Sequence, residues 1–163
     1  YLETCRRAFI YCLKLHQVNF TYADISEFMK VYQNLQPYPD AVAGLQRLAN
    51  QFSLVALSNG EQRFLEHLVT DNIQVAFDEI ISVEQVGVFK PHPSVYRRAA
   101  QTLRKEPNEI MMVAAHSFDT LGARACGYRA AYVNRYDLPT DESPYQPDLE
   151  VKDFIELADR LLR

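Results

Sequence analysis

From residue 40 onward, short apolar runs alternate with segments of helical periodicity, and this alternation constrains the fold more than any other feature. The apolar runs are residues 53–57, 79–82, 110–113 and 130–133. The helical patterns are residues 40–51, 61–70, 94–103, 117–126 and 151–162. Runs this short are expected for strands buried in a parallel sheet, and repeated βα units favour right-handed crossovers. The sequence therefore predicts an α/β fold with a Rossmann-like parallel sheet.

The first part of the chain has a different pattern. Residues 2–16 and 22–35 place apolar side chains at helical spacing, which predicts two helices. Thr21 is a candidate N-cap of the second helix, although we expect no capping-box acid three residues on. The Gln-Pro-Tyr-Pro sequence at 36–39 ends the helical pattern, because proline lacks an amide proton. We therefore expect a helical accessory segment at residues 1–37 and a main domain at 38–163.

Composition limits the possible partners. The formal net charge is −4, and no basic run exceeds two residues, which argues against a nucleic-acid partner. No apolar stretch approaches the roughly 18–20 residues that span a bilayer, so no membrane partner is expected. Cys5, Cys12 and Cys126 form no CxxC motif, which favours reduced thiols in a cytoplasmic protein over a disulfide framework or a zinc site.

Three polar turns follow or close apolar runs, and each precedes a helical pattern. They read Leu-Ser-Asn-Gly at 57–60, Val-Phe-Lys-Pro-His-Pro at 88–93 and Val-Ala-Ala-His-Ser-Phe-Asp at 113–119. In an open parallel sheet such turns lie together at the carboxyl edge, where ligands bind. The sequence thus predicts one crevice that holds a hydroxyl, an amide, an ammonium, an imidazole and a carboxylate.

Each of these turns also has an ordinary explanation when taken alone. Asn-Gly is a common turn pair, a Lys-Pro pair is usually solvated, and an acid such as Asp119 suits the first turn of a helix. Ser58 and Lys90 are 32 residues apart, and Lys90 and Asp119 are 29 residues apart. Their order at successive strand ends favours a shared active site over coincidence.

The three turns resemble motifs of the haloacid dehalogenase superfamily, most closely of its (S)-2-haloacid dehalogenase branch. Residues 57–60 resemble the second motif, residues 82–96 the third, and residues 113–119 with their continuation to 135 the fourth. The similarity covers about residues 38–162 as the core domain. The two leading helices look like part of the helical cap of that family.

The resemblance implies a hydrolytic dehalogenase that acts on short 2-haloacids without metal or cofactor. An aspartate after the first strand displaces halide and forms an ester, which water hydrolyses to the 2-hydroxy acid. It further implies that Lys90 holds that aspartate ionised, that Ser58 and Asn59 bind the substrate carboxylate or polarise the ester, and that Asp119 steadies Lys90 and places water. A homodimer is implied as well.

The resemblance also assigns residues to the substrate end of the site. Tyr96 would line it, and Phe118 stands where the branch commonly has an aromatic pocket wall. Phe20, in the helical segment, is a weaker candidate for the same wall. His116, together with Ala114, replaces the Ser-x-Asn of the branch and adds a group that titrates near pH 6 to 7.

The chain departs from the family in what it lacks. No Asp-x-Tyr-Gly-Thr motif and no convincing halide-contacting arginine occur among the 163 residues. We therefore expect the nucleophile upstream of Tyr1 and no activity from the 163-residue chain alone. In the family the first strand is central, so its absence would leave two strand edges unpaired and the isolated chain poorly soluble or unstable.

Two alternatives stay open at this point. A magnesium-dependent phosphatase on the same fold needs several carboxylates around the cation, and Ala115 occupies the earlier acidic position of the phosphatase motif. A non-catalytic, truncated homologue would instead use the crevice for binding. Chloride release without magnesium favours the dehalogenase, and magnesium-dependent phosphate release favours the phosphatase.

Overall fold

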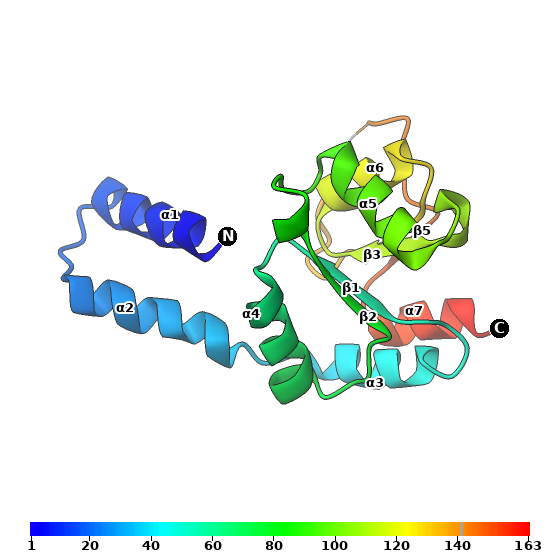
Figure 1. Cartoon of the computed structure of the whole chain (residues 1–163), viewed down its shortest axis with the longest axis horizontal. Helices are drawn as coiled ribbons and strands as arrows, with labels where there is room; N and C mark the ends of the chain where they lie inside the picture. The colour runs from blue at the N-terminus through cyan, green and yellow to red at the C-terminus, as the bar shows by residue number, and fades with distance from the viewer. Residues whose placement is uncertain (141) are drawn as a thin grey trace.

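A computed structural model describes residues 1–140 and 142–163 of the chain, and all of its strand pairs are parallel. In one sheet β1 (Val55–Ser58) pairs with β2 (Glu79–Ser82). In the other, β4 (Arg129–Val133) lies between β3 (Met111–Ala114) and β5 (Leu149–Val151). Figure 1 shows the strands with helices around them. The predicted parallel α/β fold is confirmed.

Helices cover both faces of these sheets. They are α3 (Pro39–Leu48), α4 (Gln62–His67), α5 (Pro93–Leu103), α6 (Ser117–Ala125) and α7 (Phe154–Leu161). In β3, Met111 and Val113 pack against the core formed with α3 and α7, whereas Met112 and Ala114 pack against the core formed with α5 and α6. Because successive strand side chains point to opposite faces, one short strand serves both cores.

The prediction was incomplete at the carboxyl end. We expected a helix from residue 151, but Val151 belongs to β5 and α7 begins only at Phe154. The Asp153 side chain caps that helix by accepting a hydrogen bond from Glu156 N at 2.8 Å. A strand of three residues directly after a polar, proline-rich segment carries no periodicity of its own, so β5 was missed.

The first two helices form an antiparallel pair that stands apart from the sheets (Figure 1). They are α1 (Leu2–Leu15) and α2 (Tyr22–Val31). Phe9 and Phe28 stack between them with ring centroids 3.5 Å apart. Thr21 caps α2 as predicted, but the expectation of no capping-box acid is wrong. Asp24 accepts a hydrogen bond from Thr21 N at 2.7 Å and completes a capping box, because its shorter carboxylate reaches the same amide as the usual Glu or Gln.

One edge of β1 is open. Leu54 N donates to Asp78 Oδ2 and Leu54 O accepts from Asp78 N, both at 2.8 Å, so the backbone groups of Leu54 face β2. Backbone groups alternate in direction along a strand, and those of Val55 and Leu57 therefore point away from β2. All four residues of β1 are only half-buried, whereas the last four of β4 are buried.

The facing edge of β3 is open as well. Arg129 N donates to Ile110 O at 2.9 Å, so the backbone groups of Met111 and Val113 point away from β4. No strand within residues 1–140 and 142–163 pairs with either edge. The parallel arrangement is therefore interrupted between β1 and β3.

Helices α3 and α7 pack closely, and two features hold them together. Both carboxylate oxygens of Asp40 accept hydrogen bonds from the Arg135 guanidinium, at 2.9 and 2.8 Å, and Asp40 Oδ2 also accepts from Phe154 N at 3.0 Å. At Gly44 the helices approach so nearly that a Cβ there would lie 2.6 Å from Phe154 Cβ. Glycine at this position is therefore a packing requirement.

We expect Gly44→Ala to lower the free energy of unfolding by about 1–3 kcal/mol, because the added methyl group must push α7 away from α3. Equilibrium urea unfolding measures the change. Gln46→Ala, at an exposed position of the same helix, is the control and should stay near the parent value. Equal stability of Gly44→Ala and the parent would contradict the close packing.

Candidate active site

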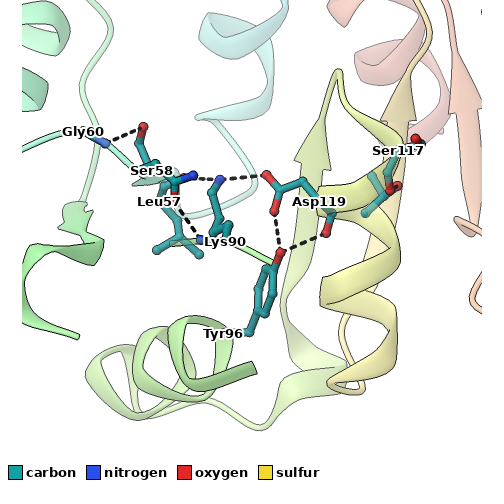
Figure 2. A network of polar contacts seen from close by, with 9 residues as sticks. Leu57, Ser58, Gly60, Lys90, Tyr96, Ser117 and Asp119 are labelled. Carbon is teal, nitrogen blue, oxygen red and sulfur yellow. Dashed lines mark hydrogen bonds and ion pairs between the residues drawn. The ribbon is translucent and has the colours of Figure 1, made fainter. Parts of the chain in front are cut away.

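Lys90 joins the three polar turns (Figure 2). Its Nζ donates to Leu57 O at 2.9 Å and to Asp119 Oδ2 at 2.7 Å, and its backbone nitrogen donates to Asn59 Oδ1 at 2.8 Å. The structure thus brings Asn59, Lys90 and Asp119 into contact at the carboxyl ends of β1 and β3, with Ser58 in the same turn as Asn59, and this cluster occupies the place of the predicted crevice.

The ion pair between Lys90 and Asp119 is almost fully buried. The side chains of Lys90 and Asp119 are 11% and 8% exposed. Removing either partner leaves an uncompensated buried charge, which costs far more than loss of an exposed pair. The Leu57 carbonyl that also accepts from Nζ lies on the open edge of β1, so the ammonium faces the interruption between β1 and β3.

Among the described residues only two acceptors meet the Lys90 ammonium, which leaves one of its donors open. A lysine side chain has three donors, and Leu57 O and Asp119 Oδ2 occupy two of them. A carboxylate brought to the interruption would satisfy the third and meet a positive charge at once.

Tyr96 holds Asp119 from the other side. Its hydroxyl donates to Asp119 Oδ1 at 2.7 Å, and its side chain is 0% exposed. We predicted that Tyr96 lines the substrate end, but a side chain with no exposed surface cannot do so. Burial, followed by the hydrogen bond to Asp119, raises the pKa of Tyr96 well above its usual value, so the hydroxyl stays a donor.

Two further residues support Tyr96. Tyr128 Oη donates to Tyr96 O at 2.7 Å and packs edge-on against the Tyr96 ring. A Cβ at Gly122 would lie 2.8 Å from Tyr96 Oη and 2.7 Å from Pro91 Cβ. Glycine therefore lets α6 approach both the Lys90 turn and α5.

The turn after β1 is held in place by its own polar groups. Gly60 N donates to Ser58 Oγ at 3.4 Å, and the buried Ser82 hydroxyl donates to Gly60 O at 2.6 Å. Asn59 uses its side-chain oxygen to hold the backbone of Lys90. Ser58 and Asn59 thus lie at the end of an anchored turn, beside the ammonium.

The other predicted residues divide into two groups. His116 and Phe118 are both exposed at the start of α6, with ring centroids 5.6 Å apart. Phe20 is not brought to the crevice, because it lies in the connection between α1 and α2, at the end of the helical pair remote from the sheets (Figure 1). The expectation that Phe20 belongs to the same apolar wall as Phe118 has no support in this arrangement.

Sequence reasoning missed Tyr128, Gly122 and the Leu57 carbonyl. Any residue type carries a backbone carbonyl, so the sequence does not show which carbonyl will accept a hydrogen bond from Lys90. Tyr128 contacts the site only through Tyr96, so it belongs to none of the motifs. Gly122 lay within the fourth motif, yet its reason, the close approach of α6, depends on where α5 lies.

No group of three or more His, Cys, Asp or Glu side chains in the described part of the chain is arranged to hold a metal ion. No helix in residues 1–140 and 142–163 combines the length and apolar character needed to cross a membrane.

The fold and crevice define an α/β protein of the Rossmann-like class whose site lies at the carboxyl ends of parallel strands. Residues 6–127 match the profile of haloacid dehalogenase-like hydrolases, and the chain belongs to this family, in its (S)-2-haloacid dehalogenase branch. The family profile therefore covers most of the helical pair and all three polar turns.

Individual relatives agree with this assignment. The chain is 38% identical over 135 residues to an (S)-2-haloacid dehalogenase of Pseudomonas putida, covering 82% of this chain and 60% of the relative. It is 34% identical over 140 residues to another from Pseudomonas sp. (strain CBS-3), covering 85% and 62%. The chain thus spans somewhat under two thirds of the length of these relatives.

A solved structure is also similar. The L-2-haloacid dehalogenase from Xanthobacter autotrophicus, with chloropropionic acid covalently bound, superposes with a TM-score of 0.85 at 30% identity. The superposition covers 99% of this chain and 75% of that one. The described helices and strands therefore reproduce most of that dehalogenase.

The buried tyrosines predict a loss of stability at alkaline pH. Burial raises the pKa of Tyr128 from 10.0 to about 12. Below pH 10 Tyr128 is protonated in both the folded and the unfolded chain, so its contribution to the free energy of unfolding is fully present. As the pH rises from 10 toward about 12, the unfolded chain loses this proton first and the contribution is lost. Between these pH values the parent should lose about 1–2 kcal/mol more than Tyr128→Phe.

Urea unfolding at a series of pH values measures this difference. Tyr128→Phe starts from a lower stability, because its hydrogen bond to Tyr96 is lost, so the slopes and not the absolute values are compared. Tyr11→Phe, at a position 65% exposed, is the matched control and should keep the parent slope. Parallel profiles for the parent and Tyr128→Phe would contradict the assignment.

Proposed function

We propose that the protein to which this chain belongs is a hydrolytic dehalogenase of short 2-haloacids. The observation that carries this proposal is the Lys90–Asp119 pair, which faces the interruption between two parallel strand edges and keeps a donor for a further acceptor. Because the chain spans about 60% of its relatives, the activity is proposed for a longer protein.

The nucleophile is proposed to be an aspartate at the carboxyl end of a strand that fills the interruption. Such a strand would pair with the open edges of β1 and β3, and its terminal carboxylate would reach Lys90 Nζ. The carboxylate oxygen bonds to the halogen-bearing carbon, and the carbon–halogen bond breaks with its electron pair leaving on the halide. Attack from the opposite side inverts the configuration.

Hydrolysis of the ester uses residues of this chain. Water attacks the aspartyl carbonyl carbon, and the bond from that carbon to the substrate oxygen breaks. One proton of the water ends on that oxygen to give the 2-hydroxy acid, the other is released to solvent, and the aspartate is restored as a carboxylate. An ionised carboxylate has about four acceptor sites, so Asp119 can place this water while it still accepts from Lys90 and Tyr96. Ser58 and Asn59 are proposed to bind the substrate carboxylate or to polarise the ester.

His116 and Phe118 are proposed to contact the substrate. Their exposed, neighbouring rings at the start of α6 supply an apolar wall with one titratable group.

The domain organisation, the oligomeric state and the cellular location are proposed as well. We assign residues 1–37 to part of the helical cap and residues 38–163 to the core domain. The exposed apolar side chains Tyr11, Leu15 and Tyr22 on the helical pair support a homodimer, and three free cysteines support a cytoplasmic protein.

The proposed reaction is tested by chloride release from (S)-2-chloropropionate, without added magnesium, by the full-length protein. Lys90→Met should lower kcat by about a hundredfold to a thousandfold, because the charge that orients and stabilises the nucleophile is removed. Lys105→Met, at an exposed lysine paired with Glu109, is the control and should retain parent activity.

Activity of Lys90→Met within tenfold of the parent would refute the assigned role of Lys90. Phosphate release from p-nitrophenyl phosphate that requires magnesium, without chloride release, would instead support the phosphatase alternative.

The strand interruption gives a separate prediction. In the full-length protein the amides of Leu57 and Val113, which lie on the open edges, should be protected to within about tenfold of those of Ala56 and Met112, because a strand would pair with these edges. Ala56 and Met112, whose backbone groups face β2 and β4, are the internal controls. Exchange of Leu57 and Val113 about a hundredfold or more faster than that of the controls would refute a strand at this place.

A further inference from the structure

Residues 36–39 connect the helical pair to the core, and core residues hold this connection near both of its ends. Directly before it, Asn72 Nδ2 donates to Leu35 O at 2.6 Å. Near its other end, the Tyr38 ring lies against the guanidinium of Arg135, whose Cζ is 4.2 Å from the ring centroid. Proline at 37 and at 39 restricts the backbone further, because proline fixes its own φ and limits the residue before it. The connection is therefore an anchored joint and not a free linker.

Arg135 is in turn held in place by Asp40. Both terminal nitrogens of the guanidinium donate to the Asp40 carboxylate, at 2.9 and 2.8 Å, and the Arg135 side chain is 13% exposed. These hydrogen bonds hold the pKa of Asp40 below its usual value, so the pair stays charged at neutral pH. A planar guanidinium can bind a carboxylate with its edge while an aromatic ring covers its face. Arg135 thus fixes Tyr38 against the first turn of α3, where Asp40 lies.

The hydroxyl of Tyr38 makes a smaller contribution to the joint. Tyr38 Oη and Tyr136 Oη share a hydrogen bond at 3.0 Å, but both side chains are exposed, so water can replace either partner. The contact on which the joint depends is therefore the stack of Tyr38 on Arg135.

This joint lies at the edge of the sheets that carries the candidate active site. Arg135 comes two residues after β4 ends, and β4 pairs with β3, whose carboxyl end leads to the buried ion pair. The helical pair meets the same edge again where the Tyr1 ring packs against Phe89, directly before Lys90. Because the pair otherwise stands apart from the sheets (Figure 1), the direction of the chain at Tyr38 decides how α1 and α2 lie relative to that turn.

We propose that Arg135 and Tyr38 form a positioning clamp, which fixes the direction in which the helical pair leaves the core and thereby governs how firmly substrate is held. The catalytic consequence rests on the proposed function, because a cover over a site retains substrate only while it is seated. Both residues act through the placement of α1 and α2 and take no part in the bond changes.

Tyr38→Ala tests the clamp in the full-length protein, because it removes the stack at an exposed position and leaves the pair of Arg135 with Asp40 in place. With (S)-2-chloropropionate, Tyr38→Ala should raise KM about fivefold and leave kcat within about twofold, since loss of one cation–π contact loosens the joint but changes no reacting group. Arg135→Lys should do the same, because a lysine keeps a charge for Asp40 but lacks the planar group that serves both partners at once.

Two further variants separate the stack from other effects. Tyr38→Phe keeps the ring and loses only the hydroxyl, so it should stay within about twofold of the parent in both KM and kcat. Phe52→Ala is the matched control, since Phe52 is another exposed aromatic residue and lies beyond the opposite end of α3. It should also keep the parent values.

Amide exchange reports on the joint without catalysis. Ala41 N donates to Tyr38 O at 2.9 Å, so its exchange depends on how firmly Tyr38 is held. Exchange of Ala41 should be about fivefold faster in Tyr38→Ala and Arg135→Lys than in the parent, and unchanged in Tyr38→Phe and Phe52→Ala. If the full-length parent releases no chloride, the proposed function fails, and the exchange rates alone decide whether the clamp holds the joint.

Parent values of KM and of Ala41 exchange in Tyr38→Ala would overturn the inference. A fall in kcat with KM unchanged would overturn it as well, because Tyr38 would then belong to the chemistry. An equal rise of KM in Tyr38→Phe would refute the clamp, since the ring is still present in that variant. If Arg135→Lys does not fold, the comparison of Tyr38→Ala with Tyr38→Phe decides the question by itself.

Discussion

The buried ion pair between Lys90 and Asp119 is the interaction on which the rest of the site depends. Its two residues come from turns that follow β2 and β3, so the pair joins the two separate sheets by side chains where no backbone pairing joins them. Buried charges need polar partners: the Leu57 carbonyl meets the ammonium and the Tyr96 hydroxyl meets the carboxylate, while Asn59 holds the backbone of Lys90. The polar network therefore follows from the need to keep two charges ionised at an interrupted sheet.

The same interruption is the place that the proposed nucleophile strand would fill. Open edges of parallel strands present unpaired backbone groups in a regular row, which another extended strand can match. A strand in this place would run parallel to β1 and β3, and its last residue would meet an ammonium with one donor to spare. An aspartate suits that position, because its carboxylate is held ionised by the charge it meets.

Much of the fold was predictable because the βα alternation from residue 40 is local in sequence. The strand-end motifs predict that Ser58, Asn59, Lys90 and Asp119 lie together, since strand order alone brings carboxyl ends to one edge. The predictions that failed depended on how segments distant in sequence are arranged in space. The burial of Tyr96 is set by α6 and by Tyr128, and the remote position of Phe20 by the direction of α1 and α2. Strand β5 is short and is stabilised by its pairing with β4. The local sequence of residues 149–151 does not indicate this pairing.

The helical pair shows how an accessory segment becomes part of a site without lending it a reactive group. Within α1 no residue is buried and α2 buries only Ile25, so the pair gains little from a core of its own. Its orientation must come from its connection to the core at residues 36–39 and from the packing of the Tyr1 ring against Phe89, which immediately precedes Lys90. The helical pair therefore meets the core beside one of the polar turns.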